Sequence, residues 1–327
     1  MRERSGRPGA RLMSPASLDI LLATRDGAAF LPVQLQSLLE QSDRDFRILA
    51  RDDGSVDDTP SLLRGFASEH PGVLEFVIDA ATAGTASANF SLLMAASEAP
   101  YVMFCDQDDQ WLPGKVAATR ECMAELEKEH GRNTPLLVHT DLSVVDEELG
   151  EIDASMWRFQ KLDPACVGRF NRMLVQNAAT GCTLMVNRAL LAKAQPVAPE
   201  AIMHDWWLVL VASAFGAVGE VRAATLRYRQ HDRSDRGAER MSIVDLPGRL
   251  IKLSEREEWL ANFQRTRLQA SAFARRYAHE LDGRRRVEVE AYAALGELGW
   301  LERRWSILRH GFLPMGWIRK LGMLARL

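Results

Sequence analysis

The sequence predicts an α/β fold with a mainly parallel central sheet flanked by helices, followed by a helical C-terminal extension. Two features of the 327-residue chain indicate this fold. From residue 18 onward, short apolar runs alternate with longer amphipathic runs, which is the pattern of strands joined by crossover helices. Each early apolar run also ends in a polar cluster, as expected where parallel strands reach the edge of a sheet.

The first half of the chain alternates regularly between the two kinds of element. Apolar runs predict strands at residues 18–23, 47–51, 74–78 and 101–105. Helical spacing predicts helices at about 30–41, 59–72, 89–97 and 115–131. Pro60 suits the first turn of the second helix, and Pro71 with Gly72 suits its end.

The second half is predicted to be less regular. Strands are expected at residues 136–145, 181–186, 217–221 and 225–228, and the alternation weakens after about residue 150. Ser254 and Glu257 form a capping box ahead of a helical pattern that runs to Leu281, where Gly283 suits the C′ position. We therefore expect a disordered basic tail at residues 1–15, an α/β domain at 16–240 and a helical region at 241–327.

The composition excludes several classes of function. The chain has 41 Lys and Arg against 44 Asp and Glu, so no overall positive field attracts nucleic acid. The four cysteines have no zinc-ligand spacing and are expected as reduced core residues. Neither a dinucleotide-binding Gly-x-Gly-x-x-Gly nor a P-loop is present. Nicotinamide and P-loop kinase chemistry are therefore disfavoured.

The sequence also predicts where the protein works. The basic start of the chain lacks the apolar run of a signal peptide. No stretch approaches the roughly 20 consecutive apolar residues that a spanning helix needs. We expect a protein of the cytoplasm, or one that lies against the cytoplasmic face of a membrane.

Three polar clusters follow predicted strands and define the candidate site. They are Thr24-Arg25-Asp26-Gly27, then the acidic run at residues 52–58, and then Asp106-Gln107-Asp108-Asp109. Because ligands of open α/β sheets bind beyond the carboxyl ends of the strands, these clusters are expected to line one cleft. Carboxylates gathered there repel one another unless a cation lies between them. A divalent cation that carries a phosphorylated ligand is the simplest candidate.

Asp106 and Asp108 are the most specific of these acidic residues. Carboxylates at i and i+2 after an apolar strand supply hard oxygen ligands for Mg²⁺ or Mn²⁺. The competing interpretation is a solvated Asp-rich turn. Asp53 has two interpretations as well: its carboxylate accepts a hydrogen bond from a nucleoside, or it belongs to a turn that caps the next helix.

The ordered motifs resemble glycosyltransferase family 2, in its rhamnosyltransferase-like branch. The matching stretches are Ala23-Thr-Arg-Asp-Gly-Ala, Arg51-Asp-Asp-Gly-Ser-Val-Asp-Asp-Thr, Ala88-Asn-Phe, Phe104-Cys-Asp-Gln-Asp-Asp-Gln-Trp-Leu-Pro-Gly-Lys, Asn177-Ala-Ala-Thr-Gly-Cys-Thr, His204-Asp-Trp-Trp and Tyr228-Arg-Gln-His. They cover residues from about 17 to 232. The resemblance implies a GT-A fold, which is Rossmann-like. It also implies an inverting transfer of a sugar, a 6-deoxyhexose such as rhamnose, from a nucleoside-diphosphate sugar to a surface-polysaccharide or O-antigen acceptor.

The resemblance also implies roles for individual residues. Thr24 and Asp53 would contact the nucleoside, Asp106 the ribose or the metal, and Asp108 the metal. Asp205 falls where the family keeps its general base, which takes the proton of the acceptor hydroxyl. His231 is expected at the metal or diphosphate and Lys115 at phosphate, unless the histidine is structural and the lysine pairs with surface carboxylates. On the acceptor side we expect Asp109, Trp111, Asn177, Thr183, His204, Trp206 and Trp207.

Several alternatives remain open from the sequence. His204 to Trp207 also fit the start of a buried helix with core tryptophans. A non-catalytic protein that binds nucleotide sugars or glycans, and a sugar-phosphate nucleotidyltransferase, are the rival functions. The tail mixes tryptophan, leucine and arginine after residue 300, which suits either contact with an anionic membrane or a helix pair packed on the catalytic domain. The expected partners are a nucleotide-sugar donor and a glycan or lipid-linked glycan acceptor.

Overall fold

The strands of the first half form the parallel part of one central sheet. A computed structural model describes residues 16–78, 82–231 and 253–327. In it β1 (Leu18–Thr24), β2 (Arg47–Asp52), β3 (Leu74–Phe76) and β4 (Tyr101–Cys105) lie in the order β3-β2-β1-β4 and pair in parallel. The expected tail at residues 1–15 and the domain boundary at residue 240 lie outside the described residues.

The second half of the sheet is mixed. Beyond β4 the order continues through β8 (Met185–Asn187), β6 (Leu136–Val145), β9 (Ala217–Arg229) and β5 (Gln110–Trp111). β8 runs antiparallel to both β4 and β6, whereas β9 runs parallel to β6. A short strand, β7 (Glu151–Asp153), pairs antiparallel with β6 at its end. The parallel pairing expected for most of the sheet is thus found among its first four strands and between β6 and β9.

Two strand predictions in this half are corrected by the structure. The strand expected at residues 181–186 is split, because Gly181–Thr183 form the 3₁₀ helix η2 and β8 begins only at Met185. The two strands expected at 217–221 and 225–228 are one strand, β9. Its register against β6 passes from Thr140 opposite Val221 to Asp141 opposite Ala224, so the intervening residues form a bulge. That bulge interrupts the alternating pattern that the sequence displays.

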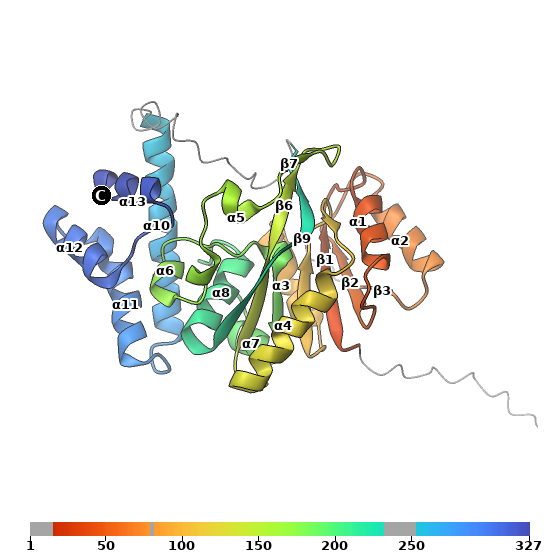
Figure 1. Ribbon diagram of the computed structural model, residues 1–327, viewed down its shortest axis with the longest axis horizontal. Coiled ribbons are helices and arrows are strands. Elements are labelled where there is room, and N and C mark those ends of the chain that lie inside the picture. Colours follow the sequence, from red (N-terminus) through yellow and green to blue (C-terminus); the bar gives the residue numbers. More distant parts are fainter. Residues whose placement is uncertain (1–15, 79–81, 232–252) are drawn as a thin grey trace, which may run out of the picture.

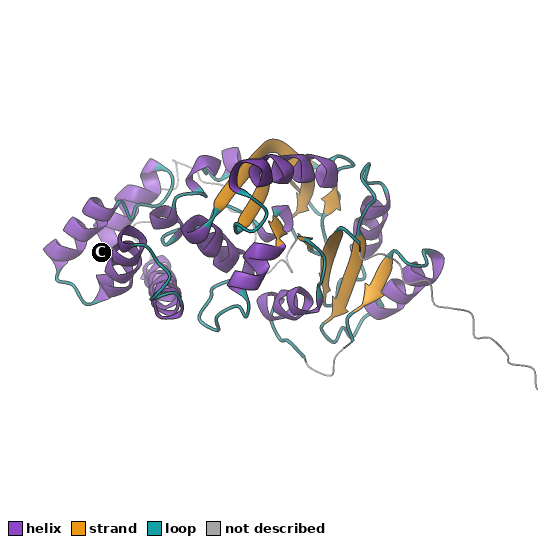
Figure 2. Ribbon diagram, turned by 90° about the horizontal axis from the view of Figure 1, so that it is seen from below, coloured by secondary structure: helices purple, strands orange, loops and turns teal. Residues whose placement is uncertain are grey.

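Helices cover both faces of the sheet (Figures 1 and 2). α1 (Leu31–Leu39), α2 (Thr59–Glu69) and α4 (Lys115–His130) pack in one apolar cluster with alternate residues of β1. The opposite cluster contains Leu21 of β1 and side chains of α3 (Ala86–Ala96), α7 (Arg188–Ala194) and α8 (His204–Phe215). Burial on both faces explains why these strands read as nearly continuous apolar runs rather than strictly alternating ones.

Short helices fill the irregular region that the sequence indicated after residue 150. They are α5 (Met156–Phe159), η1 (Pro164–Cys166) and α6 (Phe170–Met173). They link β7 to the loop that carries η2, next to the start of α8. This connection contains only short helices joined by loops, as expected for a segment that shapes a binding site rather than the sheet.

The C-terminal region is helical and packs on the α/β unit. It consists of α10 (Leu253–Arg276), α11 (Gly283–Ala293), η3 (Ala294–Gly296), α12 (Trp300–His310) and α13 (Trp317–Arg326). The rings of Trp207 in α8 and Phe273 in α10 lie 5.4 Å apart, edge to face, in one shared core. Gly283 was expected just past a helix end, but it begins α11, because the side chain of Asp282 caps that helix through the N–H of Arg285.

Candidate functional site

The loops that follow β1 and β2 are joined by hydrogen bonds at the carboxyl edge of the sheet. The Thr24 hydroxyl donates to Oδ1 of Asp52 over 2.9 Å. The N–H of Asp26 donates to the Ser55 hydroxyl, and the N–H of Val56 donates to Oδ1 of Asp26. Asp26 adopts a positive φ of 49°, which an aspartate tolerates better than most residues. The first two polar clusters therefore form one connected surface, as predicted.

Asp53 is buried and is held by the chain itself. Its carboxylate lies 3.1 Å from the Arg51 guanidinium and accepts hydrogen bonds from the N–H groups of Ala83 and Gly84. Burial by itself would raise the pKa of Asp53, but these backbone hydrogen bonds and Arg51 outweigh it and lower the pKa. Nη1 of Arg25 lies 3.7 Å from Oδ2 of Asp53. Asp53 thus fixes the loop before α3.

Sequence reasoning missed the buried partners of Asp53. Arg51 is 2% exposed, and its guanidinium also donates to Oδ1 of Asn89 in α3 over 2.9 Å. A charged residue within an otherwise apolar strand was the available signal for Arg51. For Asn89 the signal was its place in the Ala88-Asn-Phe stretch. Together these side chains tie β2 to α3 directly beneath the site.

Two carboxylates and a thiol converge beside β4. Single ligand atoms of Asp106, Asp109 and Cys182 all lie within 4.8 Å of one another. Asp109 is fully buried, and its Oδ2 has no hydrogen-bond partner among the described residues. Burial, followed by the neighbouring carboxylates of Asp108 and Asp106, raises the pKa of Asp109 well above its usual range. Such a cluster gains stability from any cation that enters it.

His231 joins the end of β9 to the acidic loop. Its Nε2 lies 2.9 Å from Oδ2 of Asp108, and its ring stacks on Phe30 at a centroid distance of 4.6 Å. Arg229 holds the same loop, because its Nε donates to the carbonyl of Asp108 over 2.9 Å. Residues more than a hundred positions apart in the chain therefore meet at one point. Asp108 and His231 therefore meet at the edge of the sheet, whereas the ligand atoms of Asp106, on the same loop, lie with those of Asp109 and Cys182.

The side chains in this group fit a hard divalent cation. Asp106 and Asp108 offer carboxylate oxygens and His231 offers an imidazole nitrogen, a set that suits Mg²⁺ or Mn²⁺. Cys182 does not extend this set. Burial and the nearby Asp109 carboxylate raise the pKa of the Cys182 thiol well above its usual range. A neutral thiol is a poor ligand for either ion.

Asp205 lies in the first turn of α8, next to η2. The N–H of Trp206 donates to Oδ1 of Asp205 over 2.6 Å, and Nδ2 of Asn177 lies 3.4 Å from its Oδ2. A Cβ atom placed on Gly181 would lie 3.5 Å from the Cβ of Asp205. Because Cys182 follows Gly181 and contacts Asp106 and Asp109, η2 links Asp205 to the acidic cluster. The partly exposed carboxylate of Asp205 is thus positioned beside the candidate metal site.

The other residues expected on the acceptor side around Asp205 are buried. Trp206 and Trp207 donate their Nε1–H groups to the carbonyls of Met173 and Ala194. His204 packs between Phe90 and Phe104, and burial lowers its pKa to about 3. The structural interpretation as a buried helix start therefore holds for these three residues. Direct stacking of the tryptophans on a sugar is not supported.

Thr183, Trp111 and Lys115 are also removed from the cleft. The Thr183 hydroxyl donates to the carbonyl of Thr180 and shapes the η2 loop. Lys115 is fully buried, with its Nζ 4.7 Å from the centroid of the Trp111 ring and 3.4 Å from the Thr225 hydroxyl. Burial lowers the pKa of Lys115 to about 8. The expected contacts of Lys115 with phosphate and of Trp111 with the acceptor are not supported, because neither side chain reaches the surface.

Comparison with known proteins relates this site to nucleotide-sugar transferases by sequence and by fold. Residues 19–130 match the family described as glycosyl transferase family 2. The dTDP-rhamnosyl transferase RfbG of Shigella flexneri is 24% identical over 223 residues, which is 66% of this chain and 74% of that protein. The matched family region includes all three polar clusters.

Solved structures of glycosyltransferases share the overall fold. TarS residues 1–349 of S. aureus in complex with UDP-GlcNAc align with a TM-score of 0.55 and 13% identity, over 89% of this chain and 73% of that chain. The mannosyltransferase PcManGT from Pyrobaculum calidifontis, in complex with GDP-Man and Mn²⁺, aligns with a TM-score of 0.54 and 15% identity, over 91% and 74%. These matches confirm the expected GT-A fold.

Proposed function

We propose that this glycosyltransferase, whose residues 19–130 match glycosyl transferase family 2, transfers a 6-deoxyhexose such as rhamnose. The donor is the nucleoside-diphosphate sugar, and the acceptor is a surface polysaccharide or O-antigen, as a glycan or a lipid-linked glycan. The likeness to a dTDP-rhamnosyl transferase supports the choice of sugar. We place the reaction in the cytoplasm, against the inner face of the cytoplasmic membrane.

The observation that carries the proposal is the contact between Asp108 and His231, on the same acidic loop as the cluster of Asp106, Asp109 and Cys182. Oδ2 of Asp108 lies 2.9 Å from Nε2 of His231, and η2 connects this group to Asp205. In our proposal Asp106, Asp108 and His231 hold Mg²⁺ or Mn²⁺. When bound, such a cation offsets the negative charge that develops on a departing nucleoside diphosphate. Thr24 and Asp53 form the wall of the nucleoside pocket, with Arg25 beside them.

Asp205 acts as the general base in a single displacement. Its carboxylate takes the proton of the acceptor hydroxyl while that oxygen forms a bond to the anomeric carbon. The bond from the anomeric carbon to the diphosphate oxygen breaks at the same time, so the configuration at that carbon inverts. The N–H of Trp206 and the Asn177 amide keep the Asp205 carboxylate oriented. A carboxylate can serve as this base because the proton moves only as the new bond forms.

A panel of nucleotide sugars tests the proposal. We expect release of nucleoside diphosphate from dTDP-rhamnose when Mn²⁺ and a suitable acceptor are present, and we expect Asp108→Ala and Asp205→Ala to abolish it. Thermal shift with each donor reports binding separately from turnover. Donor binding without turnover under all conditions would instead indicate a non-catalytic binding protein. Formation of nucleotide sugar from a nucleoside triphosphate and a sugar phosphate would indicate a nucleotidyltransferase.

A further inference from the structure

The helices α12 and α13 expose large hydrophobic side chains on the faces that point away from the core. Their inner faces bury Ile307 and Met323. The exposed side chains, here called the C-terminal apolar face, are Trp300 at 61% exposure, Leu301 at 72%, Trp305 at 61%, Leu308 at 61%, Trp317 at 52% and Leu321 at 58%. The outer face of a surface helix is normally charged or polar. A helix that is apolar on both sides has a second surface to bury.

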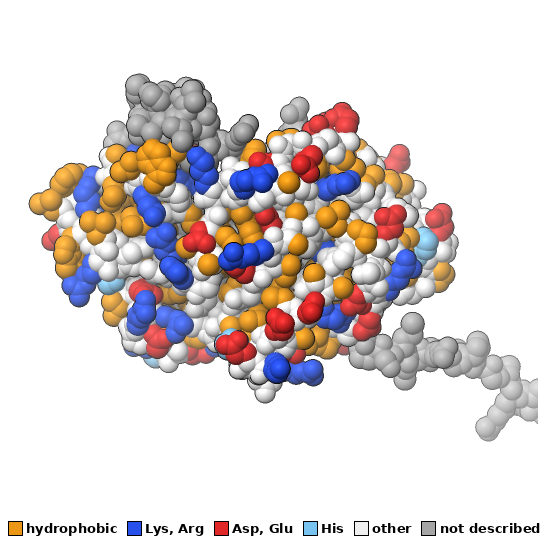
Figure 3. All heavy atoms as spheres, in the orientation of Figure 1, with side chains coloured by type: hydrophobic (Ala, Val, Ile, Leu, Met, Phe, Trp, Pro, Cys, Tyr) orange, Lys and Arg blue, Asp and Glu red, His pale blue; other side chains and the backbone are white. Residues whose placement is uncertain are grey.

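The C-terminal apolar face is surrounded by positive charge. Among residues 300–327, Glu302 is the one acidic side chain, and the basic side chains are Arg303, Arg304, Arg309, Arg319, Lys320 and Arg326. The guanidinium carbon of Arg304 lies 3.8 Å from the ring centroid of Trp300, and that of Arg309 lies 4.7 Å from the ring of Trp305. Figure 3 shows hydrophobic and basic side chains mixed over the end of the molecule where Figure 1 places these helices.

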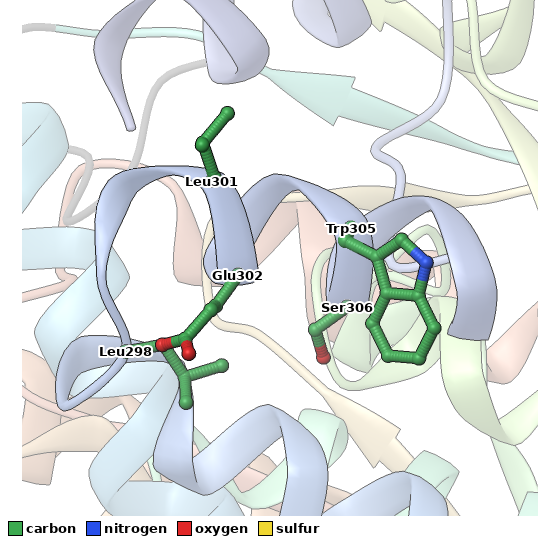
Figure 4. Close-up of a pocket in the computed structure, with 5 residues that line it drawn as sticks. All are labelled: Leu298, Leu301, Glu302, Trp305 and Ser306. Atoms are coloured by element: carbon green, nitrogen blue, oxygen red, sulfur yellow. The ribbon is translucent and has the colours of Figure 1, made fainter.

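The surface between the apolar side chains is also hollowed. Leu298, Leu301, Glu302, Trp305 and Ser306 line an open hollow of about 480 Å³ on α12 (Figure 4). Its walls are mainly apolar, and its rim carries an exposed indole ring. Indole rings prefer the headgroup level of a bilayer, where the ring is buried and its N–H remains hydrated.

We propose that the C-terminal apolar face docks on the surface of an anionic phospholipid bilayer. The tryptophans and leucines enter the boundary between headgroups and acyl chains, and Arg309 and Lys320 pair with lipid phosphates. The helices lie on the bilayer and do not cross it, since no helix in the described part of the chain is long and apolar enough to span a membrane. This inference goes beyond the proposed sugar transfer, because it concerns a separate surface.

A second copy of the chain fits this face less well than lipid. A symmetric dimer brings the same patch of both subunits together, so the basic side chains around each apolar face would meet those of the other. Charges of the same sign repel in such an arrangement, and an anionic lipid surface compensates them instead. The charge pattern therefore favours lipid phosphate over self-association.

Flotation of the full-length chain with lipid vesicles tests the proposal. The vesicles are either phosphatidylcholine alone or equal parts phosphatidylcholine and phosphatidylglycerol. We expect the chain to float with the anionic vesicles, to float much less with the neutral ones, and to be released by high salt. The combined variant Trp300→Ala and Trp305→Ala should lower the partition coefficient at least tenfold. In Arg309→Gln with Lys320→Gln, each lost charge should lower it about fivefold, since one basic residue near such a surface contributes about 1 kcal/mol.

Controls separate loss of docking from loss of folding. Ile152→Ala removes an exposed side chain at 47% exposure from β7, outside the C-terminal apolar face, and should float like the parent chain. The thermal unfolding midpoint should be unchanged in every variant, because the altered side chains are on the surface. Equal flotation of the parent and the tryptophan variant would overturn the proposal. The proposal would also be overturned if light scattering showed that the parent chain is a dimer and the tryptophan variant a monomer, and neither chain bound vesicles.

Discussion

Nε2 of His231 lies 2.9 Å from Oδ2 of Asp108, although 123 positions separate the two residues in the chain. This contact joins the end of β9 to the acidic loop after β4, where we propose that a cation binds. The stacking of His231 on Phe30 and the hydrogen bond from Arg229 to the Asp108 carbonyl hold both partners in place. The predictions below start from this arrangement.

The first prediction concerns metal affinity. His231→Ala removes a nitrogen ligand and should weaken Mn²⁺ binding at least about tenfold, and Asp108→Asn should weaken it further. Titration calorimetry with Mn²⁺ measures both effects. His130→Ala changes an exposed histidine of α4 and serves as the control. Unchanged Mn²⁺ affinity in His231→Ala would exclude this residue as a ligand.

The second prediction concerns proton transfer. Asp205→Asn keeps the hydrogen bond acceptor for the Trp206 N–H but cannot take a proton, so kcat should fall by about 10²- to 10⁴-fold. Donor affinity, measured by thermal shift, should stay the same, and the acidic limb of the kcat/KM pH profile should disappear. Glu200→Gln, on an exposed carboxylate in the preceding loop, should change none of these. A variant at Asp205 with full kcat would refute the assignment of the base.

The third prediction concerns the buried pair beneath the nucleoside site. Asp53→Asn removes the carboxylate that faces Arg51, both being about 2% exposed, and should lower the free energy of unfolding by about 3 kcal/mol. The loop at Ala83 and Gly84 also loses one of its two acceptor oxygens, because Asn has a single amide oxygen, so donor affinity should fall too. Urea denaturation and donor titration measure the two effects. Asp58 is exposed in the same loop, so Asp58→Asn serves as the control. If Asp53→Asn lost no more stability than Asp58→Asn, the account would be contradicted.

The fourth prediction concerns the pH dependence of stability. Burial lowers the pKa of His204 to about 3, below the ordinary value of 6.5 that applies to the unfolded chain. Below pH 6.5 the unfolded state therefore binds a proton that the folded state does not, and stability falls as the pH falls towards 3. This single group should cost about 2 kcal/mol at pH 5. In His204→Phe the thermal unfolding midpoint should depend less on pH between pH 6.5 and 4. An unchanged pH dependence would show that His204 is not the cause.

The parallel half of the fold was predictable because its signals are local. β1, β2 and β4 each lie close to the predicted apolar run, since both faces of these strands are buried and the pattern needs no distant information. The bulge in β9 and the 3₁₀ helix η2 were not predictable in this way. Both arise from how β6 and α8 pack against segments far away in the sequence, and local spacing carries no record of that packing.

The site was predictable to the same extent. The acidic residues at the carboxyl edge followed from the position of each cluster after a strand. Burial of Lys115, Trp206 and Trp207 did not, because the same residue types suit a cleft or a core, and only tertiary packing decides between them. The place of Cys182 beside Asp106 was also hidden, because the two residues lie on segments that meet only in the folded chain.

The most direct test of a cation held by Asp106, Asp108 and His231 is the rate of nucleoside diphosphate release from dTDP-rhamnose in the presence of acceptor, before and after chelation. We predict that EDTA abolishes release and that added Mn²⁺ restores it in the parent chain but not in Asp108→Asn. Full activity of the parent chain in EDTA, with no response to Mn²⁺, would contradict the account.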